Sequence, residues 1–445
     1  MTQPGPDLAD FTLDVFQNEY LPAGARDVNA IVTVTSGRLS APLGPSAAAE
    51  VIMVDCSGSM NDPADKMAEA KTATATAIDA LRDGTSFAVI AGNEKAHPVF
   101  PSDASLAVAT PQARDAAKQA VLGLQADGGT AIGQWLLLAH QIFTSGAKGD
   151  DGSPVRHAIL LTDGKNQHET PEQLAGAISW CEGAFSCDCR GVGTDWEVAE
   201  LRKISTALLG TVDIVADPAG LAADFTSLMH TAMNKQISDV SLRVWTPQHG
   251  QIKFLKQVAP DVVDLTGRRA VAGPQAGDYP SGAWGPGESR DYHLCVEVSP
   301  AGVGQEMLAA RVSLVSGPGP AVLGQGLVRA LWTDDEALST RINPHVAHYT
   351  GQAELAQVIQ DGLQARKEGD EDTATAKLGR AVTLANQAGN EDTARLLAKV
   401  VEVHDTTGTV RLRKKVADAD EMALDTRSTK TVRTKKLSPG LGKAN

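Results

Sequence analysis

Side chains with oxygen donors that could hold a metal ion occur at three points of the sequence. Asp55, Ser57 and Ser59 lie in the run DCSGS directly after an apolar stretch, and Thr130 lies in ADGGTAIG. Asp163 follows a second apolar stretch, in LLTDG. Three neutral hydroxyls and two carboxylates form an all-oxygen set that suits Mg²⁺ or Mn²⁺ better than Zn²⁺. An ion bound mainly by hydroxyls and water stays electrophilic and would accept a carboxylate from another molecule.

The elements that must position these residues are expected to form an open α/β sheet. Short apolar strands alternate with helices, which is typical of a mostly parallel sheet covered on both faces. The expected strands are 51–54, 87–91, 157–161, 186–192 and 212–215, and the expected helices are 65–82, 111–124, 131–145, 171–181, 195–209 and 221–234. Ligands of such sheets bind at the carboxyl ends of strands, where Asp55 and Asp163 lie.

The order of these motifs resembles the metal-ion-dependent adhesion site of von Willebrand factor type A domains. The resemblance covers roughly residues 48–235 and all five motif positions. It implies a doubly wound sheet in which Ser57, Ser59 and Thr130 ligate Mg²⁺ or Mn²⁺ directly, while Asp55 and Asp163 hold its water ligands. It also implies a protein partner that presents an acidic residue to the metal, and a stand-alone bacterial cytoplasmic protein.

Two other interpretations of the same residues stay open. Ser and Asp at strand ends also cap helices without binding any metal. Enzymes of the haloacid-dehalogenase type place DxD at a similar strand end, but Ser57 stands where their acid/base Asp would be. The sequence also lacks the GxSxG and GxxxxGK(S/T) motifs of hydrolases and nucleotide-binding proteins.

Antiparallel strands are expected on both sides of the α/β domain at 48–235. Apolar residues alternate with period two in 11–40 and again in 237–335, with turns such as SGPGP between the runs. Neither piece alone completes a sandwich, so we expect the α/β domain to be inserted into one antiparallel β-sandwich-like module.

Residues 344–404 are expected to form a helical bundle or hairpin. Their apolar residues follow a helical period, and GDEDTA at 369–374 recurs as GNEDTA at 389–394. In each copy the Gly is suited to end one helix and an Asp or Thr to cap the next.

The last segment, residues 405–445, is basic and rich in Thr. From residue 406 onward there are ten Lys or Arg and four Asp or Glu, so this part has a net charge of +6. Since the whole chain has a net charge of −14, the remaining residues have a net charge of −20. TxTVR occurs at 407–411 and again at 429–433. We expect a flexible tail that is either featureless or phosphorylated by a kinase at Thr431, with Thr409 or Thr434 as alternates. The resemblance associates such proteins with Ser/Thr kinases and with forkhead-associated-domain proteins, which read phosphothreonine.

Three cysteines form a C-x5-C-x-C cluster, namely Cys181, Cys187 and Cys189. They would bind Zn²⁺ with His168 or Cys56 as a fourth ligand, or else fill an apolar core. An odd total of five cysteines favours a reducing compartment.

Composition limits the remaining function classes. A net charge of −14 on 445 residues disfavours a specific nucleic-acid binder, and no apolar stretch approaches the ~18 residues of a membrane span. Without an apparent signal peptide, we expect a cytoplasmic protein. The favoured function is a divalent-metal-dependent adaptor or scaffold, without catalysis of its own, in a signalling or stress-response complex. Alternatives are a regulatory subunit for an AAA+ ATPase and a metal-dependent phosphatase-like enzyme.

Overall fold

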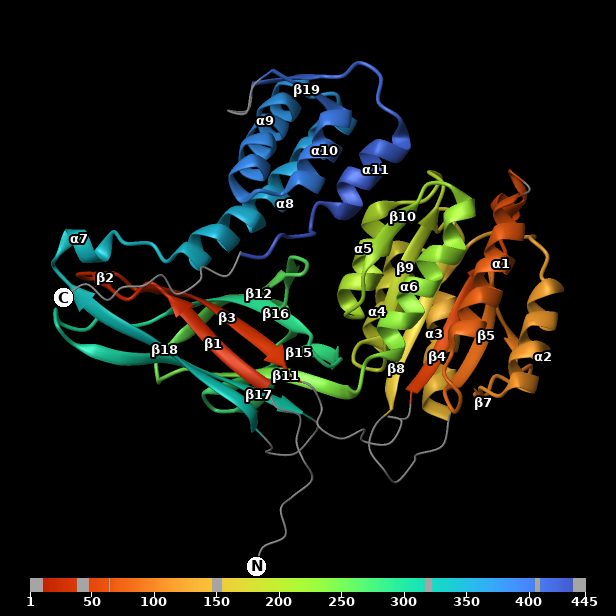
Figure 1. Ribbon diagram of the computed structural model, residues 1–445, viewed down its shortest axis with the longest axis horizontal. Coiled ribbons are helices and arrows are strands. Elements are labelled where there is room, and N and C mark those ends of the chain that lie inside the picture. The colour runs from red at the N-terminus through yellow and green to blue at the C-terminus, as the bar shows by residue number, and fades with distance from the viewer. Residues whose placement is uncertain are drawn as a thin grey trace, which may run out of the picture.

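A computed structural model describes residues 11–37, 48–63, 65–145, 154–316, 322–404 and 409–434. It confirms the expected fold class, because an α/β domain is inserted into an antiparallel sandwich and is followed by helices (Figure 1). Within these ranges, no helix is both long enough and apolar enough to cross a membrane.

The inserted domain is a twisted sheet with helices on both faces. Its strands are β4 (Ala48–Asp55), β5 (Ser86–Gly92), β6 (Ala96–Phe100), β7 (Ala107–Val108), β8 (Val155–Thr162), β9 (Ser186–Val192) and β10 (Val212–Val215). They run in the order β10-β9-β8-β4-β5-β6, all parallel except β6 and β7, which pair antiparallel with β5. The sequence analysis missed β6 and β7, whose side chains are at most half-buried.

Six helices cover this sheet, three on each face. They are α1 (Asp65–Ala80), α2 (Pro111–Leu122), α3 (Ile132–Ser145), α4 (Pro171–Cys181), α5 (Val198–Ala207) and α6 (Leu221–Met233). The apolar residues of α3, α4 and α5 pack on one face, and those of α1, α2 and α6 pack on the other. The domain therefore has two apolar cores separated by the buried strands.

The sandwich is built from strands on both sides of the insertion. One sheet has the order β1-β3-β16-β12-β13 and the other β14-β15-β11-β17-β18-β2. The strands are β1 (Phe11–Gln17), β2 (Leu21–Pro22), β3 (Asp27–Ser36), β11 (Ile237–Trp245), β12 (Gln251–Ala259), β13 (Val263–Asp264), β14 (Ala270–Gly273), β15 (Ala276–Trp284), β16 (Ser289–Glu297), β17 (Glu306–Ser316) and β18 (Val322–Thr333). Because β3 pairs with β16 along its length, the sandwich closes only when the segments before and after the insertion meet. Tyr279, Trp284, Tyr292 and Trp332 fill its core.

The repeated GDEDTA and GNEDTA motifs join consecutive helices. The elements that follow the sandwich are α7 (Glu336–Ser339), α8 (Pro344–Glu368), α9 (Glu371–Ala388), α10 (Glu391–Val400) and β19 (Val401–Val403). Gly369 and Gly389 end α8 and α9 in the left-handed conformation, with φ of +82° and +66°. Asp370 and Asn390 then accept hydrogen bonds from backbone amides in the next first turn, as N-caps do. The expected Asp cap is thus confirmed for the first copy, whereas in the second copy Asn390, and not an Asp or Thr, caps the helix.

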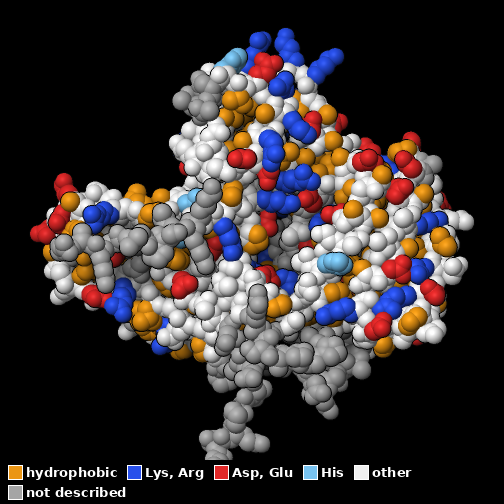
Figure 2. All heavy atoms as spheres, viewed as in Figure 1, with side chains coloured by type: hydrophobic (Ala, Val, Ile, Leu, Met, Phe, Trp, Pro, Cys, Tyr) orange, Lys and Arg blue, Asp and Glu red, His pale blue; other side chains and the backbone are white. Residues whose placement is uncertain are grey.

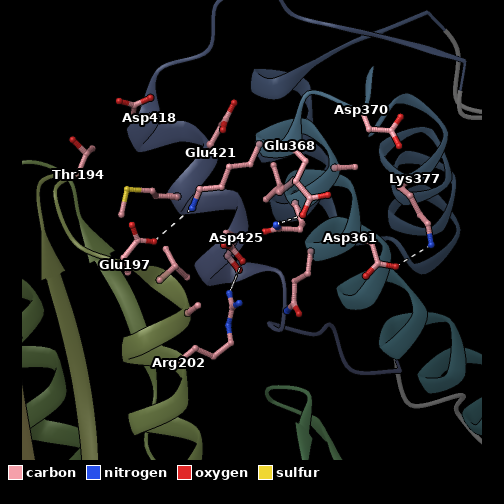
Figure 3. A pocket seen from close by; sticks show the side chains of 18 of the residues that line it. Thr194, Glu197, Arg202, Asp361, Glu368, Asp370, Lys377, Asp418, Glu421 and Asp425 are labelled. Atoms are coloured by element: carbon pink, nitrogen blue, oxygen red, sulfur yellow. Dashed lines mark hydrogen bonds and ion pairs between the residues drawn. The ribbon is translucent and has the colours of Figure 1, made fainter. Parts of the chain in front are cut away.

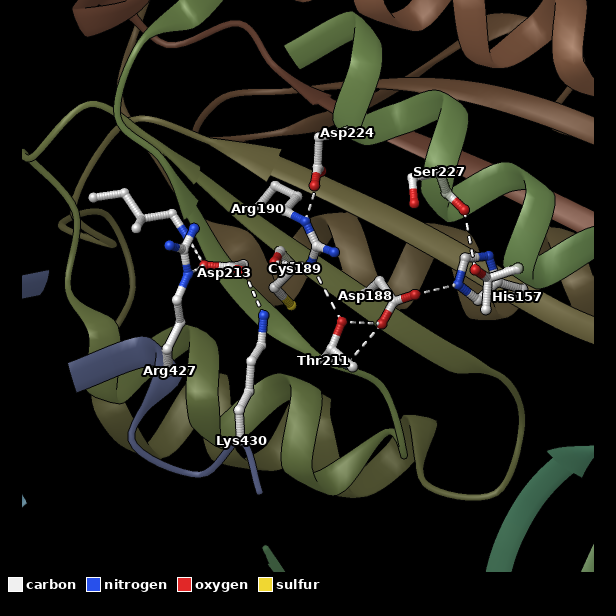
Figure 4. Close-up of polar contacts among 12 residues, drawn as sticks. His157, Asp188, Cys189, Arg190, Thr211, Asp213, Asp224, Ser227, Arg427 and Lys430 are labelled. Carbon is white, nitrogen blue, oxygen red and sulfur yellow. Dashed lines mark hydrogen bonds and ion pairs between the residues drawn. The ribbon is translucent and has the colours of Figure 1, made fainter. Parts of the chain in front are cut away.

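The expectation of a flexible tail is wrong for residues 409–434. Val410–Leu412 forms β20, which pairs with β19, and Asp418–Arg427 forms α11, whose Leu424 is fully buried in the helical core. Asp213, the second residue of β10, forms ion pairs with Arg427 and Lys430 (Figure 4). Two basic residues of this segment thus neutralise an acid of the α/β domain. Residues 405–408 and 435–445 lie outside the described residues.

A buried charged network links three neighbouring strands at the edge opposite the strand carboxyl ends. His157 of β8 lies 2.9 Å from Glu50 of β4 and 3.0 Å from Asp188 of β9. Figure 4 shows the contact with Asp188. Burial disfavours a charged imidazole, but the charges and hydrogen bonds of Glu50 and Asp188 raise the pKa of His157 to about 10. The buried imidazole is therefore protonated and ties β4, β8 and β9 together.

We expect Leu424→Ala to loosen α11, because the substitution leaves a cavity where a fully buried side chain lay. Such truncations cost about 2–5 kcal/mol. Hydrogen exchange of the α11 amides should accelerate accordingly. The control is Val403→Ala, since Val403 is 41% exposed and should leave that exchange unchanged. Equal α11 exchange in both variants would show that this segment does not pack as described.

We expect the free energy of unfolding to fall as the pH rises above about 6.5, and the fall to depend on His157. Its folded-state pKa lies above the unfolded value of about 6.5. The stabilisation by protonated His157 is therefore complete below pH 6.5 and is lost as the pH approaches 10. The free energy of unfolding is measured by denaturation at pH 6, 7.5 and 9. Its fall with pH should be smaller for His157→Gln than for wild type or for a variant of the exposed His230. Parallel slopes in all three proteins would refute this assignment.

Candidate metal centre

Two carboxylates lie at one edge of the sheet in the inserted domain, where β4 and β8 end. Parallel pairing sets Val54 of β4 beside Leu161 of β8, so Asp55, the last residue of β4, and Asp163, directly after β8, lie at the ends of neighbouring strands. Both side chains are fully buried. The apolar residues before each Asp form central strands that are covered on both faces. This burial fixes the position at which each strand ends.

Three hydroxyls converge beside these carboxylates. Ser57 and Ser59 lie in the turn after β4, and their oxygens are 2.9 Å apart. Ser59 donates a hydrogen bond to Asp163 Oδ1 at 2.7 Å. A Cβ atom added at Gly164 would lie 3.2 Å from Ser59 Oγ, 3.3 Å from Thr130 Oγ1 and 3.9 Å from Ser57 Oγ. The structure thus brings together all five residues that the sequence analysis singled out.

Asp55 organises the turn that carries the two serines. Its Oδ1 accepts a hydrogen bond from the Ser57 amide at 2.7 Å, and its Oδ2 accepts one from Thr162 Oγ1 at 2.5 Å. Burial raises the pKa of Asp55 to about 6, although these hydrogen bonds lower it. A cation beside the carboxylate would relieve the penalty of burying this charge.

Thr130 is held by polar side chains that the sequence analysis did not assign to this site. The amide before Thr130 donates to Glu94 Oε2 at 2.8 Å, and the Thr130 amide donates to His168 Nδ1 at 3.2 Å. The first amides of α3 donate likewise to Asn166 and Glu169. Three of these four acceptors lie in the run KNQHE just after Asp163-Gly, and this polar run was the available signal.

Lys66 adds a buried cation that the sequence analysis also missed. Its Nζ lies 2.8 Å from Asp163 Oδ2 and 3.5 Å from Asp195 Oδ2, and its side chain is 5% exposed. Burial opposes its charge, but the two carboxylates raise the pKa of Lys66 above its ordinary value. The centre therefore contains two buried carboxylates and one ammonium group.

The donor set fits a hard divalent cation. All candidate ligand atoms are oxygens, three of them neutral, and the exposed side chain of Ser59 leaves one side open to solvent. Ser57, Ser59 and Thr130 would bind such an ion directly, and Asp55 and Asp163 would hold its water ligands. The ion would supply a Lewis-acidic position for an anionic oxygen atom.

A polar groove of about 910 Å³ lies between this edge and the C-terminal helices (Figure 3). Lys165, Thr194 and Glu197 line it from the α/β domain, and residues of α8, α9 and α11 line the other wall. Figure 2 shows basic and acidic side chains interleaved where the two parts meet. Ion pairs such as that between Arg202 and Asp425 cross the groove and hold its walls together.

The zinc site considered for the cysteines is not supported. Cys181, Cys187 and Cys189 are buried in the apolar core under α3, α4 and α5, and in the described ranges no three or more His, Cys, Asp or Glu side chains form a group that could hold a metal ion. Burial raises the pKa of Cys181 to about 12, so its thiol stays protonated. His168 lies at the Thr130 loop, and Cys56 packs on the opposite face of the sheet. The core interpretation of these thiols is the one that the structure favours.

The predicted phosphorylation sites have different surroundings. Thr431 Oγ1 donates to the carbonyl oxygens of Val258 and Pro260 at 2.7 and 3.0 Å, so a kinase would have to detach this segment first. The premise that made Thr431 the favoured site is therefore wrong. Thr434 Oγ1 is 3.1 Å from Nδ1 of His345. Thr409 is exposed, and its phosphorylation stays a prediction.

Two family models match this chain. The model described as von Willebrand factor type A domain matches residues 49–214, and the one described as von Willebrand factor type A C-terminal domain matches residues 383–428. The second match includes α11, which agrees with an ordered C-terminal segment. No curated protein matches the chain.

Solved structures resemble the chain over nearly its whole length. A von Willebrand factor type A protein from Catenulispora acidiphila is 52% identical, with a TM-score of 0.91, and the match covers 97% of this chain and 99% of that one. The ArnB paralog VWA2 from Sulfolobus acidocaldarius is 12% identical, with a TM-score of 0.54 and coverage of 95% and 98%. Human COPII-coat protein Sec24c is 10% identical, with a TM-score of 0.53 and coverage of 87% and 57%. The last two similarities show the fold alone.

Proposed function

The chain belongs to the von Willebrand factor type A family, and from this premise we propose that it is an adaptor that binds a protein partner through a divalent cation. Domains of this family generally mediate protein–protein interactions and are generally non-catalytic. The proposed cation is Mg²⁺ or Mn²⁺, held by Asp55, Ser57, Ser59, Thr130 and Asp163. Five free, buried thiols support a reducing compartment, and we place the adaptor in the cytoplasm, within a signalling or stress-response complex.

The convergence of three hydroxyls around one point carries this proposal. Ser57, Ser59 and Thr130 come from two separate loops, and their oxygens surround the position that a Gly164 Cβ would take. Pure helix capping requires no such convergence, because each cap serves only its own helix. Neutral ligands leave most of the charge of a divalent ion uncompensated, so an acidic side chain of the partner would complete its coordination.

We expect full-length protein to bind Mg²⁺ in calorimetry, and binding to weaken at least about tenfold in Gly164→Ala and Ser59→Ala. The first variant brings a methyl group against the three hydroxyls without removing a donor, and the second removes one donor. Matched controls are Gly176→Ala, where an added Cβ meets nothing within 4 Å, and Thr72→Ala on the exposed side of α1. Unchanged affinity in both site variants, or no Mg²⁺ or Mn²⁺ binding by wild type, would refute the proposed centre.

We also expect a partner to depend on the cation. Affinity capture from the native lysate, followed by mass spectrometry, should retain at least one protein in Mg²⁺, lose it in EDTA and recover it when Mg²⁺ is restored. Ser59→Ala should lose the same protein, and Thr72→Ala should keep it. A set of captured proteins that is identical under all these conditions would show that partners use another surface.

A further inference from the structure

We propose that Lys66 sets the charge of the metal centre, lowering its affinity for the cation and leaving the bound ion positive enough to recruit a carboxylate. This inference rests on the proposed function, because it concerns regulation of the same site. It assigns to Lys66 a positioning and charge-tuning role and not a ligand role.

The ammonium group of Lys66 lies directly against the centre. Its Nζ donates a hydrogen bond to Asp163 Oδ2 at 2.8 Å, while the other oxygen of the same carboxylate accepts the hydroxyl of Ser59 at 2.7 Å. One carboxylate therefore connects the candidate ligand Ser59 to Lys66. Any negative charge that Asp163 offers to a cation is shared with this ammonium group.

The position of Lys66 is unfavourable in two ways. It occupies the first turn of α1, where the helix dipole disfavours positive charge. It is also 4% exposed, and no other lysine of the described ranges is buried to this degree. A buried charge requires a partner, and Asp163 and Asp195 supply it. Hydrophobic packing does not require a lysine here, so its role is electrostatic.

Lys66 forms ion pairs with two carboxylates, one buried and one exposed. Asp195, in the loop between β9 and α5, lies 3.5 Å from Nζ, and its side chain is 72% exposed. The stem of Lys66 passes Gly193 of the same loop, where an added Cβ would lie 3.7 Å from Lys66 Cε. Asp195 draws the ammonium group away from Asp163 and so makes Asp163 more available to a cation.

The charges of the centre show what Lys66 changes. Asp55 and Asp163 carry two negative charges and Lys66 carries one positive charge, so a divalent ion would leave the filled centre at +1. Without Lys66 the filled centre would be neutral. The ammonium group therefore weakens cation binding and strengthens the attraction of the bound ion for an anionic oxygen.

The test measures binding of Mg²⁺ and Mn²⁺ alone to the full chain by calorimetry. Lys66→Met should bind either ion about tenfold more tightly than wild type, because removing one unit charge this close to a site carboxylate has at least that effect. Lys66→Arg keeps the charge and should retain an affinity within about threefold of wild type. Acetate then serves as a carboxylate probe for the Mn²⁺-loaded proteins, and its binding is measured by water-proton relaxation. It should bind more weakly to Lys66→Met than to wild type.

A second variant tests the same inference if Lys66→Met does not fold. Asp195→Asn frees Lys66 to pair with Asp163 alone, so Mg²⁺ binding should weaken about threefold. Glu197→Gln is the matched control, since Glu197 is a nearby acid that pairs with Lys165 and not with Lys66. In a folded Lys66→Met background, Asp195→Asn should have no further effect.

The possible results distinguish a failure of the proposed function from a failure of the role inferred for Lys66. Wild type that binds neither Mg²⁺ nor Mn²⁺ would overturn the proposed function and this inference together. Wild type that binds the metal while Lys66→Met binds it no more tightly would overturn the inference alone. Equal effects of Asp195→Asn and Glu197→Gln would also overturn it, because they would indicate a general surface charge effect.

Discussion

Parallel pairing between β4 and β8 places two carboxylates, those of Asp55 and Asp163, side by side at one edge of a buried sheet. Every residue of β4 is buried and its successive side chains enter the two opposite cores, so a slip of one residue would turn each side chain into the wrong core. Asp55 and Asp163 are therefore fixed next to each other away from water, where neither charge is stable alone. The Thr162 hydroxyl, the serine turn and Lys66 all compensate this burial.

The C-terminal segment holds the three parts of the molecule in one arrangement. Arg427 and Lys430 pair with Asp213 near the start of β10, and Arg202 of α5 pairs with Asp425 of α11. The backbone of Thr431 then bonds to Pro260 of the sandwich. The wall of C-terminal helices therefore lies at a defined position beside the metal centre. A partner that reached the centre would meet both the α/β domain and these helices.

The five residues of the candidate centre were predictable, whereas the supporting residues Glu94 and Lys66 were not. Asp55 and Asp163 each follow an apolar strand, and parallel sheets collect such strand ends at one edge, so local sequence was sufficient. Glu94 and Lys66 act through contacts with segments far away in the sequence, and nothing in their neighbouring residues indicates those contacts. The tail was misinterpreted for the same reason: its composition shows an excess of positive charge, but the acid that pairs with it, Asp213, lies in the inserted domain. The capping motif GDEDTA is local, and its Gly and Asp were predicted correctly.

The polar groups of the centre favour binding over proton-transfer chemistry. Both oxygens of Asp55 accept hydrogen bonds, and those of Asp163 face Ser59 and Lys66, so each carboxylate is committed to the local structure. The Cys56 thiol has its pKa raised to about 12 by burial, which keeps it protonated and unreactive. A general base must be free to accept a proton from a bound molecule. This arrangement agrees with the binding function proposed above, in which a cation with an open position toward solvent would attract an anionic side chain of a partner.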